Sequence, residues 1–304
     1  MRTAWVSSRP PKRVDRRFES ISDQRTEGQR DRDRILYSAA FRRLAGVTQV
    51  AAAGERHNFH TRLTHSLKVA QVARRIAEYH TNPGTPTSPS LIAALGGIDP
   101  DVVEAASLAH DLGHPPFGHI AEEVLDQELR ARDVNDGFEG NPQSFRIVTV
   151  LELRQAKRPG LNLTRATLNA ILKYPWHRED GHEKKERKWG AYRSEEGIFR
   201  WSRAMNPPDD ESQSLEATIM DWADDISYSV HDLEDFYRVG LIPLDRLASD
   251  SKEIDRFIKR AFERWKRRKI PAKLTEPQMK SALEFVKTDI NDRQLSLDSR
   301  YVSL

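Results

Sequence analysis

The chain has 304 residues, of which 38% are hydrophobic and 31% are charged, so it is long enough for one large domain or two ordinary ones. It contains no cysteine, which excludes disulfides and cysteine-ligated zinc sites and leads us to expect a reducing, cytoplasmic location. No run of about 18 apolar residues occurs, so we expect no membrane partner. The first residues lack an apolar region, so we also expect no signal peptide.

The net charge is +3, and the positive charge is concentrated in two stretches, residues 9–43 and residues 256–269. Either stretch could contact phosphates, for example those of single-stranded nucleic acid. The alternative, which is the more common situation for any single residue, is a solvated helix face. The sequence leaves both interpretations open.

Apolar residues recur with helical spacing along most of the chain, and strand signals are weak. The pattern predicts an all-α fold with helices at residues 31–44, 62–80, 100–111, 118–130, 142–155, 164–173, 212–238, 251–269 and 276–290. Residues 82–89 are predicted to form a loop because they consist of proline, glycine and small polar residues. Residues 177–197 are charged and aperiodic, which predicts an exposed excursion.

We expect three parts: a basic N-terminal segment (residues 1–30), a catalytic domain (31–240) and a C-terminal helical segment (241–304). The catalytic domain is placed by the densest group of reactive side chains. Three histidines and an aspartate lie within residues 110–119, after an apolar run. The adjacent His110 and Asp111 can offer a ring nitrogen and a carboxylate oxygen to one divalent cation. The alternative is a set of buried histidines that bond to the backbone.

A metal site needs further ligands from other elements. His65 lies near the start of the predicted helix 62–80, and Asp224 lies on the helix 212–238. Asp224, Tyr228 and Asp232 share one helix face because they are four residues apart, whereas Asp225 is rotated by about 100°. Two imidazoles and two carboxylates would suit metal-assisted hydrolysis.

The order His…His-Asp…Asp on a helical scaffold resembles the HD-domain phosphohydrolases. Six ordered motifs resemble, more specifically, the deoxyguanosinetriphosphate triphosphohydrolase-like family, and together they span about residues 25–240. The motifs lie within Arg42–Val50, Thr61–Ser66, His110–His119, Phe138–Ser144, Leu172–Trp176 and Ala223–Tyr228. The resemblance implies an HD-domain helical bundle with additional peripheral helices. It also implies hydrolysis of a deoxynucleoside triphosphate (dNTP) to deoxynucleoside and triphosphate, by attack of metal-activated water at the α-phosphorus.

The resemblance also implies roles for single residues. The metal ligands would be His65, His110, Asp111 and Asp224, and the metal would be Mg, Mn, Fe, Co or Ni. His119 and Glu122 match a catalytic pair, and their i, i+3 spacing lets the carboxylate orient the imidazole. His114 would contact the α-phosphate; the alternative for His114 is a loop residue bonded to backbone.

Substrate contacts follow from the same resemblance. Gln49 and Asp232 match residues near the sugar 3′-hydroxyl, and Tyr228 matches an aromatic packed against the sugar. Arg62 matches a phosphate-binding arginine, and Lys173 and Tyr174 match a pair that contacts phosphate and sugar. For Gln49, Arg62 and Lys173 the alternative is a surface position or a structural ion pair. For Asp225, helix capping or an ion pair with arginine is favoured.

Three departures from the family pattern stand out. Gly140 occupies a position where the family often has histidine, and Asn141 is expected to take over part of that role. Val47 replaces a lysine of the family's Lys-Thr-Gln-Val motif. We also expect family members to extend past the C-terminal end of this sequence, and to assemble as homo-oligomers.

Three other functions remain open from the residues alone. One is a different HD-domain hydrolase that acts on nucleoside monophosphates, cyclic nucleotides or guanosine alarmones; the sugar-contacting set argues against it. Another is a regulator with low turnover that senses nucleotides or binds single-stranded nucleic acid. The last is a purely structural helical protein.

Overall fold

A computed structural model describes residues 12–18, 23–47, 61–154, 158–207, 209–238, 250–267 and 275–292. The described residues form helices and no strand; only two isolated bridges, Arg16 with Thr164 and Leu153 with Gly160, pair extended backbone. The all-α prediction is therefore confirmed. The chain divides into two compact units, Met1–His231 and Asp232–Leu304. The predicted boundaries at residues 30 and 240 stay predictions.

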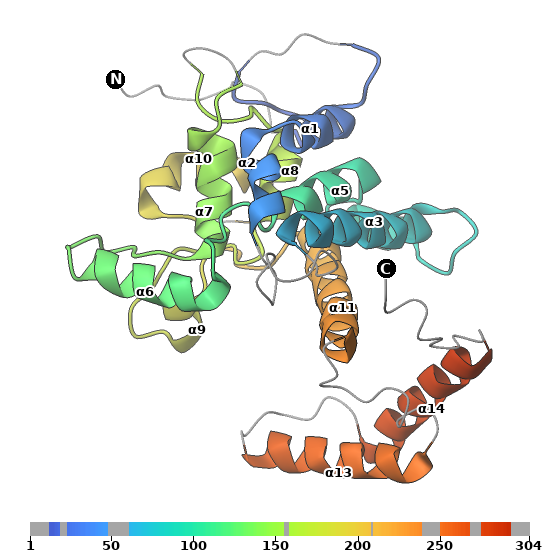
Figure 1. Ribbon diagram of the computed structural model, residues 1–304. Coiled ribbons are helices and arrows are strands. Elements are labelled where there is room, and N and C mark those ends of the chain that lie inside the picture. Colours follow the sequence, from blue (N-terminus) through green and yellow to red (C-terminus); the bar gives the residue numbers. More distant parts are fainter. Residues whose placement is uncertain are drawn as a thin grey trace. The chain divides into compact units, whose positions relative to one another are not determined.

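Figure 1 shows the described helices, coloured in chain order. Up to the long helix α11 they are α1 (Glu27–Leu36), α2 (Ala39–Arg43), η1 (Leu44–Gly46), α3 (Arg62–Thr81), α4 (Pro89–Ala94), α5 (Pro100–Ala109), α6 (Gly118–Arg130), α7 (Gly140–Arg146), η2 (Ile147–Leu151), α8 (Arg165–Ile171), α9 (Glu183–Arg187), η3 (Arg193–Glu195) and α10 (Glu196–Ser202). Then come α11 (Leu215–Arg238), α13 (Ser251–Arg267) and α14 (Glu276–Asp292).

The single helix predicted over residues 31–44 is two helices. α1 begins earlier than expected because Thr26 and Gln29 form a capping box, which satisfies backbone N–H groups at its start. It ends at Leu36, and the Ser38 side chain then accepts a hydrogen bond from the Phe41 N–H to start α2. The apolar stripe alone did not reveal this internal cap.

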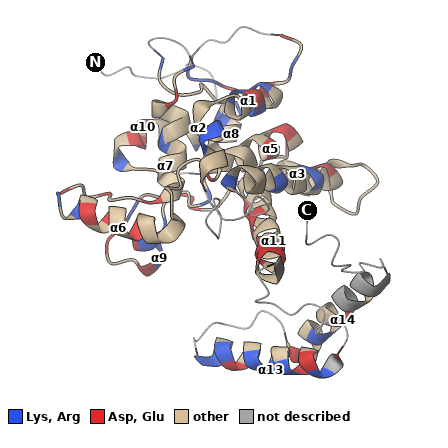
Figure 2. Ribbon diagram, in the orientation of Figure 1, with Lys and Arg blue, Asp and Glu red and all other residues tan. Residues whose placement is uncertain are grey.

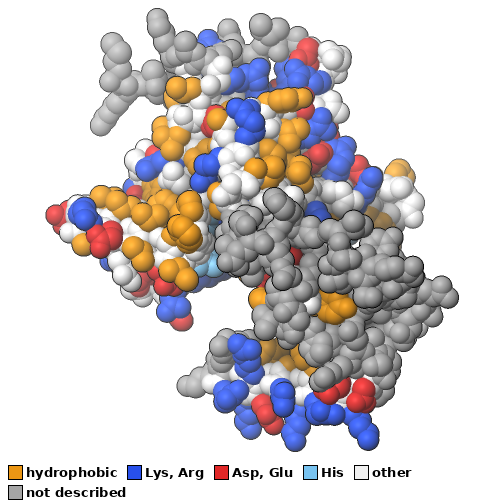
Figure 3. Space-filling view, viewed as in Figure 1, with side chains coloured by type: hydrophobic (Ala, Val, Ile, Leu, Met, Phe, Trp, Pro, Cys, Tyr) orange, Lys and Arg blue, Asp and Glu red, His pale blue; other side chains and the backbone are white. Residues whose placement is uncertain are grey.

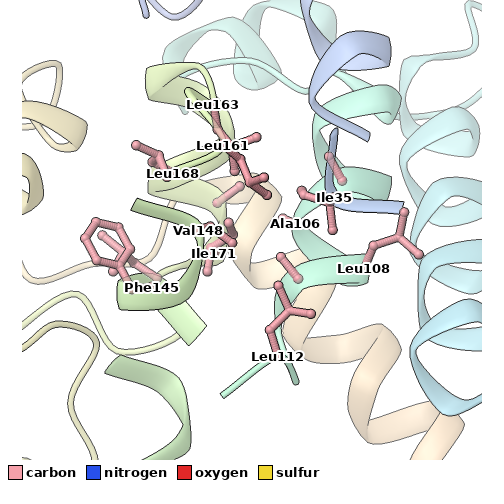
Figure 4. Packing of buried hydrophobic residues seen from close by; sticks show 14 of the residues in the cluster. Ile35, Ala106, Leu108, Leu112, Phe145, Val148, Leu161, Leu163, Leu168 and Ile171 are labelled. Atoms are coloured by element: carbon pink, nitrogen blue, oxygen red, sulfur yellow. The ribbon is translucent and has the colours of Figure 1, made fainter. Parts of the chain in front are cut away.

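Helix α5 lies at the centre of the first unit. Eight of its ten residues are buried, which is the pattern of a core helix rather than a surface one. α5 packs against α1, α3 and α8, and Figure 4 shows Ala106 between Ile35 on one side and Val148 and Ile171 on the other, with Leu108 on the opposite side of α5 from Val148. Because His110 and Asp111 directly follow this helix, the metal-binding candidates are anchored to the best-packed part of the unit.

The prediction of an exposed excursion at residues 177–197 is only partly right. α9 is exposed, but Trp189 is 1% exposed and Ala191 and Tyr192 are also buried. The returning chain pairs with residues before the excursion: the Gly190 N–H donates to the Trp176 carbonyl at 2.9 Å. Tertiary packing thus buries a segment whose charged composition indicated solvent.

The arginines of the N-terminal basic stretch form ion pairs with nearby carboxylates. Arg16 pairs with Glu27 and Asp31, and Arg25 pairs with Asp23. These two cations therefore form structural ion pairs, the alternative that the sequence left open. Phosphate binding by residues 9–43 stays a prediction.

Helix α13, in the second unit, carries Lys and Arg along much of its length (Figure 2). Its buried side is apolar and includes Ile254 and Ile258, and Lys280 of α14 pairs with Asp255 at 2.6 Å. Six of its cations have no ion-pair partner among the described residues: Lys252, Lys259, Arg260, Arg264, Lys266 and Arg267. None of the described helices is both long and apolar enough to cross a membrane.

Candidate active site

Four predicted metal ligands converge from three helical elements. His65 on α3, His110 at the end of α5 and the adjacent Asp111 offer ligand atoms that lie within 4.8 Å of one another, and all three residues are buried. The Asp224 Oδ1 atom, from α11, lies 3.0 Å from His65 Nε2 and 3.5 Å from His110 Nε2. The structure therefore brings together the two-imidazole, two-carboxylate set that sequence spacing predicted.

Local sequence explains how the ligands are placed. A Thr61–Thr64 capping box starts α3, so His65 stands one turn from its beginning. After Asp111 the chain turns tightly at Gly113, where a Cβ atom would lie 2.2 Å from the Gly140 carbonyl oxygen and 2.3 Å from the Ser144 nitrogen. Only glycine permits this approach, which holds the His110–Asp111 turn against the start of α7.

The hydrogen bonds of His110 leave one of its ring nitrogens directed into the cluster. His110 Nδ1 lies 2.6 Å from the Ser107 carbonyl oxygen, and since a carbonyl only accepts, Nδ1 must donate. His110 Nε2 is buried and has no hydrogen-bond partner in the described part of the chain. A buried nitrogen with a free lone pair among carboxylates is the usual arrangement of a metal ligand, so the residues present fit a divalent metal.

His231 orients the other ligand histidine and was not singled out from the sequence. Its Nδ1 atom lies 3.2 Å from Nδ1 of His65, and it is almost completely buried. A hydrogen bond there leaves His65 Nε2 directed at Asp224. The signal was present: His231 follows Asp224 by seven residues, so the two share one face of α11.

The charges of the site are mutually balanced. Burial would raise the pKa of Asp111, but His110, His114 and Arg62 outweigh it and hold the pKa well below the usual range. For Asp224 burial acts in the same direction, and His110 and Lys173 again lower the pKa. Both carboxylates are therefore ionised, as metal ligation requires.

Beside the metal-ligand cluster stands a second group, His114, His119 and Glu122. His114 bridges two carboxylates, with Nε2 3.1 Å from Asp111 Oδ1 and Nδ1 2.5 Å from Glu122 Oε1. Burial alone would lower the pKa of His114, but these carboxylates raise it to about 9. The two carboxylates thus favour the charged form of His114, whose ring lies between the metal-ligand cluster and Glu122.

His119 is the exposed member of this group. Its Nδ1 lies 2.8 Å from Glu122 Oε2, while its side chain is 68% exposed. Burial would raise the pKa of Glu122, but His114 and His119 outweigh it and lower the pKa. An ionised, buried carboxylate therefore orients an imidazole whose second nitrogen can exchange a proton with a bound molecule.

The predicted phosphate-binding cations lie beside the ligand carboxylates. Arg62 donates to Asp111 Oδ2 at 2.7 Å and is buried. Lys173 Nζ lies between Asp221 Oδ1 at 2.6 Å and Asp224 Oδ2 at 3.0 Å. Both cations form the structural ion pairs that the sequence left as an alternative, and their phosphate contacts stay predictions.

The structure describes the surroundings of only some of the residues expected to contact the sugar. The Tyr228 ring packs edge-on to His65 with centroids 6.4 Å apart, and Tyr174 packs near Trp176 with centroids 5.7 Å apart. Asp232 belongs to the second unit and stays a prediction. Gln49 lies outside the described residues.

The Gly140 departure has a clear geometric consequence. A Cβ atom there would lie 2.6 Å from Glu122 Oε1 and 2.7 Å from the His114 ring, so the glycine leaves room for the His114–Glu122 contact. The neighbouring Asn141 donates its side-chain amide to Glu139, at 3.0 Å from either carboxylate oxygen. The Asn141 amide is therefore hydrogen-bonded to Glu139 rather than directed at the metal-ligand cluster. The role expected for Asn141 in the site stays a prediction.

A family model described as the HD domain matches residues 62–229, more than half of the chain and a range that contains all four ligand residues. The chain belongs to the HD-domain family. HD domains bind divalent metals, and the His65, His110 and Asp111 cluster of this one could hold such an ion.

Relatives of this HD-domain chain confirm the narrower resemblance. It is 44% identical over 270 residues to a deoxyguanosinetriphosphate triphosphohydrolase-like protein of Streptomyces coelicolor, covering 86% of this chain and 57% of the relative. Proteins of the same name from Bifidobacterium longum and Caulobacter vibrioides are 43% and 42% identical; each match covers 78% of this chain, and 47% and 54% of the relative. The chain thus spans about half the length of the curated relatives it matches.

Proposed function

We propose that this HD-domain chain hydrolyses deoxynucleoside triphosphates to deoxynucleoside and intact triphosphate. The observation that carries the proposal is the placement of the His119–Glu122 pair beside a buried two-imidazole, two-carboxylate cluster. The names of its relatives support a nucleotide triphosphate as substrate. The rest of the proposal follows from what each group can do.

His65, His110, Asp111 and Asp224 would hold one divalent cation, which we propose to be Mg, Mn, Fe, Co or Ni. When bound, the cation would activate water for attack at the α-phosphorus and polarise the phosphate. His110 is suited to ligation because the Ser107 carbonyl requires its Nδ1 to donate. His65 is suited because His231 holds its Nδ1 side and leaves Nε2 facing Asp224. The remaining chemistry is assigned to protein groups.

His119 is the proposed proton donor to the departing 5′-oxygen. Its exposed imidazole can reach a bound molecule, and Glu122 holds the ring through Nδ1. We propose that His114, a buried cation, stabilises negative charge on the α-phosphate. Arg62 and Lys173 would add positive charge beside the β- and γ-phosphates.

Sugar recognition is proposed to involve Tyr228, Asp232, Tyr174, Asn141 and Gln49. Tyr228 is the best supported of these, because its ring already packs on the ligand His65. An aromatic ring against the sugar would disfavour a 2′-hydroxyl by steric exclusion. This favours deoxynucleotides over ribonucleotides as substrates.

Product analysis tests the proposal. Purified protein is incubated with Mn or Mg and with each dNTP or GTP, and the products are separated by ion-pair chromatography. We expect deoxynucleoside and intact triphosphate, lost in Asp111→Asn and retained in Asp133→Asn, which changes an exposed aspartate. Release of pyrophosphate or monophosphate would point to another branch of HD-domain chemistry, and no turnover would overturn the proposal.

A second candidate is a low-turnover regulator that binds single-stranded nucleic acid through α13. The unpaired cations of that helix favour it, since phosphate contacts supply most non-specific affinity. A Lys259→Gln, Arg260→Gln, Arg264→Gln triple variant should then lose oligonucleotide binding in fluorescence anisotropy. Equal binding by the variant and wild type would exclude this surface.

We also propose that the chain acts as a homo-oligomer, as its resemblance implies. Exposed apolar side chains are compatible with this: Figure 3 shows them over α6, where Phe117, Ile120 and Val124 are all more than half exposed. Light scattering after size-exclusion chromatography measures the mass directly. A monomer at working concentration would contradict the proposal.

A further inference from the structure

One lysine beside the site was not singled out by any sequence motif. Lys188 directly follows α9, and its Nζ atom lies 2.5 Å from Glu139 Oε1 and 3.9 Å from Glu122 Oε2. Glu122 orients His119, while Glu139 caps α7 by accepting from the Asn141 N–H at 2.6 Å. A single cation therefore contacts two carboxylates that belong to different helices.

The two carboxylates need this cation. The side chains of Glu122 and Glu139 are 7% and 4% exposed, and a buried, unpaired carboxylate is costly. Glu122 faces His114, His119 and Lys188; the only salt bridge to Glu139 among the described residues is from Lys188. Without Lys188, Glu139 would lack a cationic partner and Glu122 would lose one of three.

Lys188 is held in place by its own backbone. Its N–H donates to the Lys184 carbonyl at 3.0 Å, and its carbonyl accepts from Trp176 Nε1 at 2.7 Å. The next residue, Trp189, is buried. At Gly190 a Cβ atom would lie 2.0 Å from the Tyr174 carbonyl oxygen, so the chain passes there in close contact with the active-site segment. The lysine therefore stands on a fixed backbone, unlike a typical surface lysine.

The geometry also explains why the cation comes from this segment. A side chain at Gly140 would collide with Glu122 and His114, so α7 cannot supply a cation to Glu122 at that position. Lys188 reaches the same carboxylate from the excursion after α9. α6 and α9 lie side by side here, with Arg130 and Glu186 forming a second pair at 3.9 Å (Figure 1).

We propose that Lys188 is a positioning residue, which holds Glu122 and Glu139 so that His119 keeps its orientation. It contacts neither the metal-ligand cluster nor a reacting atom, and it acts through Glu122. This inference rests on the proposed function, in which His119 transfers a proton. It predicts that the loss of Lys188 lowers the rate of the chemical step rather than metal or substrate binding.

The test compares Lys188→Gln and Lys188→Arg with Lys185→Gln. Lys185 is a matched control because it lies in the same segment and pairs with Glu179 and Glu211, away from Glu122. We expect Lys188→Gln to lower kcat about 10-fold with KM and bound metal unchanged. Lys188→Arg should recover most of the loss, and Lys185→Gln should match wild type.

A double variant shows whether the lysine acts through the carboxylate. In a Glu122→Gln background, Lys188→Gln should cause little further loss of kcat, because the two residues form one unit. Additive losses, an unchanged kcat in Lys188→Gln, or a loss of metal in that variant would each overturn the proposal while wild-type turnover stands. Wild-type protein without turnover on any dNTP would instead overturn the proposed function, and this inference with it.

Discussion

The two sides of the site are built in different ways. The metal-ligand cluster (His65, His110, Asp111 and Asp224) stands on α3, α5 and α11, and α3 and α5 pack closely together in the core. The His119–Glu122 pair stands on α6, which has an exposed apolar face and is connected to the rest mainly by ion pairs from Glu122 and Asp126.

This difference separates two contributions to function. Packing positions the ligands, so a change there acts on metal affinity and on the fold together. Charge pairing positions His119, so a change there should act on the rate while metal affinity is kept. The variants below are ordered from the largest expected effect to the smallest, and each tests whether the separation holds.

The largest effect is expected at the cluster, from Asp224→Asn compared with Asp225→Asn. The two aspartates are neighbours on α11, but only Asp224 faces the ligand histidines, while Asp225 is exposed. Loss of a ligand removes several kcal/mol of transition-state stabilisation, so activity should fall about 1000-fold. Bound Mn is measured by elemental analysis alongside turnover. Equal losses in both variants would show that Asp224 is not a ligand.

The next effect is expected on α6, from His119→Ala and Glu122→Gln compared with Glu123→Gln. General acid catalysis contributes about 100-fold or more, so His119→Ala should lose about that much activity and keep its metal. Glu122→Gln should lose less, because the imidazole remains. Glu123 is exposed and should be neutral. Loss of bound metal in His119→Ala would show that His119 and the metal-ligand cluster do not contribute separately to rate and to metal affinity.

A smaller effect is expected from the residue behind the cluster. His231→Ala removes the partner of His65 Nδ1 and should weaken metal binding about 10- to 100-fold, as is usual for groups that orient a ligand. His182→Ala, at the exposed start of α9, is the control. Isothermal titration with Mn measures the change, and unaltered affinity in His231→Ala would show that His65 needs no such support.

The smallest effect concerns how α11 is anchored. Glu216, near its start, is buried against Arg13 and the Asp99 N–H, and burial raises its pKa from 4.5 to about 7. Between these values the folded protein binds a proton that the unfolded chain has lost, so Glu216 stabilises the fold below about pH 4.5, and this contribution disappears as the pH rises through 7.

The Glu216→Gln variant should therefore have a flatter dependence of Tm on pH between 5 and 8 than wild type. Its Tm is compared with that of Glu183→Gln, an exposed site on α9. Parallel curves for all three proteins would show that Glu216 is ionised throughout this range. Turnover should change little in either variant, since neither residue reaches the cluster.

Much of the helical framework was predictable from periodicity. Helix α6 has the predicted bounds, and α3 differs from its prediction by one residue. The four ligand candidates were also predictable, because imidazole and carboxylate chemistry at helical spacing is a local property of the chain. The internal cap at Ser38 was missed because the apolar stripe runs through it.

The two basic stretches show where such reasoning ends. By composition they look alike, yet Arg16 and Arg25 pair with nearby acids, whereas six α13 cations have no such partner in the described part of the chain. Composition counts charges, but an ion pair depends on which acid lies within about 4 Å after folding. Only the folded chain distinguishes a structural arginine from one available to a ligand.

Sequence by itself determined most of the long helices, the HD-domain resemblance and the candidate ligand residues, because each depends on residue type and short-range spacing. Tertiary structure decided the neighbours: His231 behind His65, and Lys188 between Glu122 and Glu139. These contacts join residues 49 to 166 positions apart. No local pattern encodes such a contact, because it depends on how separate helices pack and on the need to pair every buried charge.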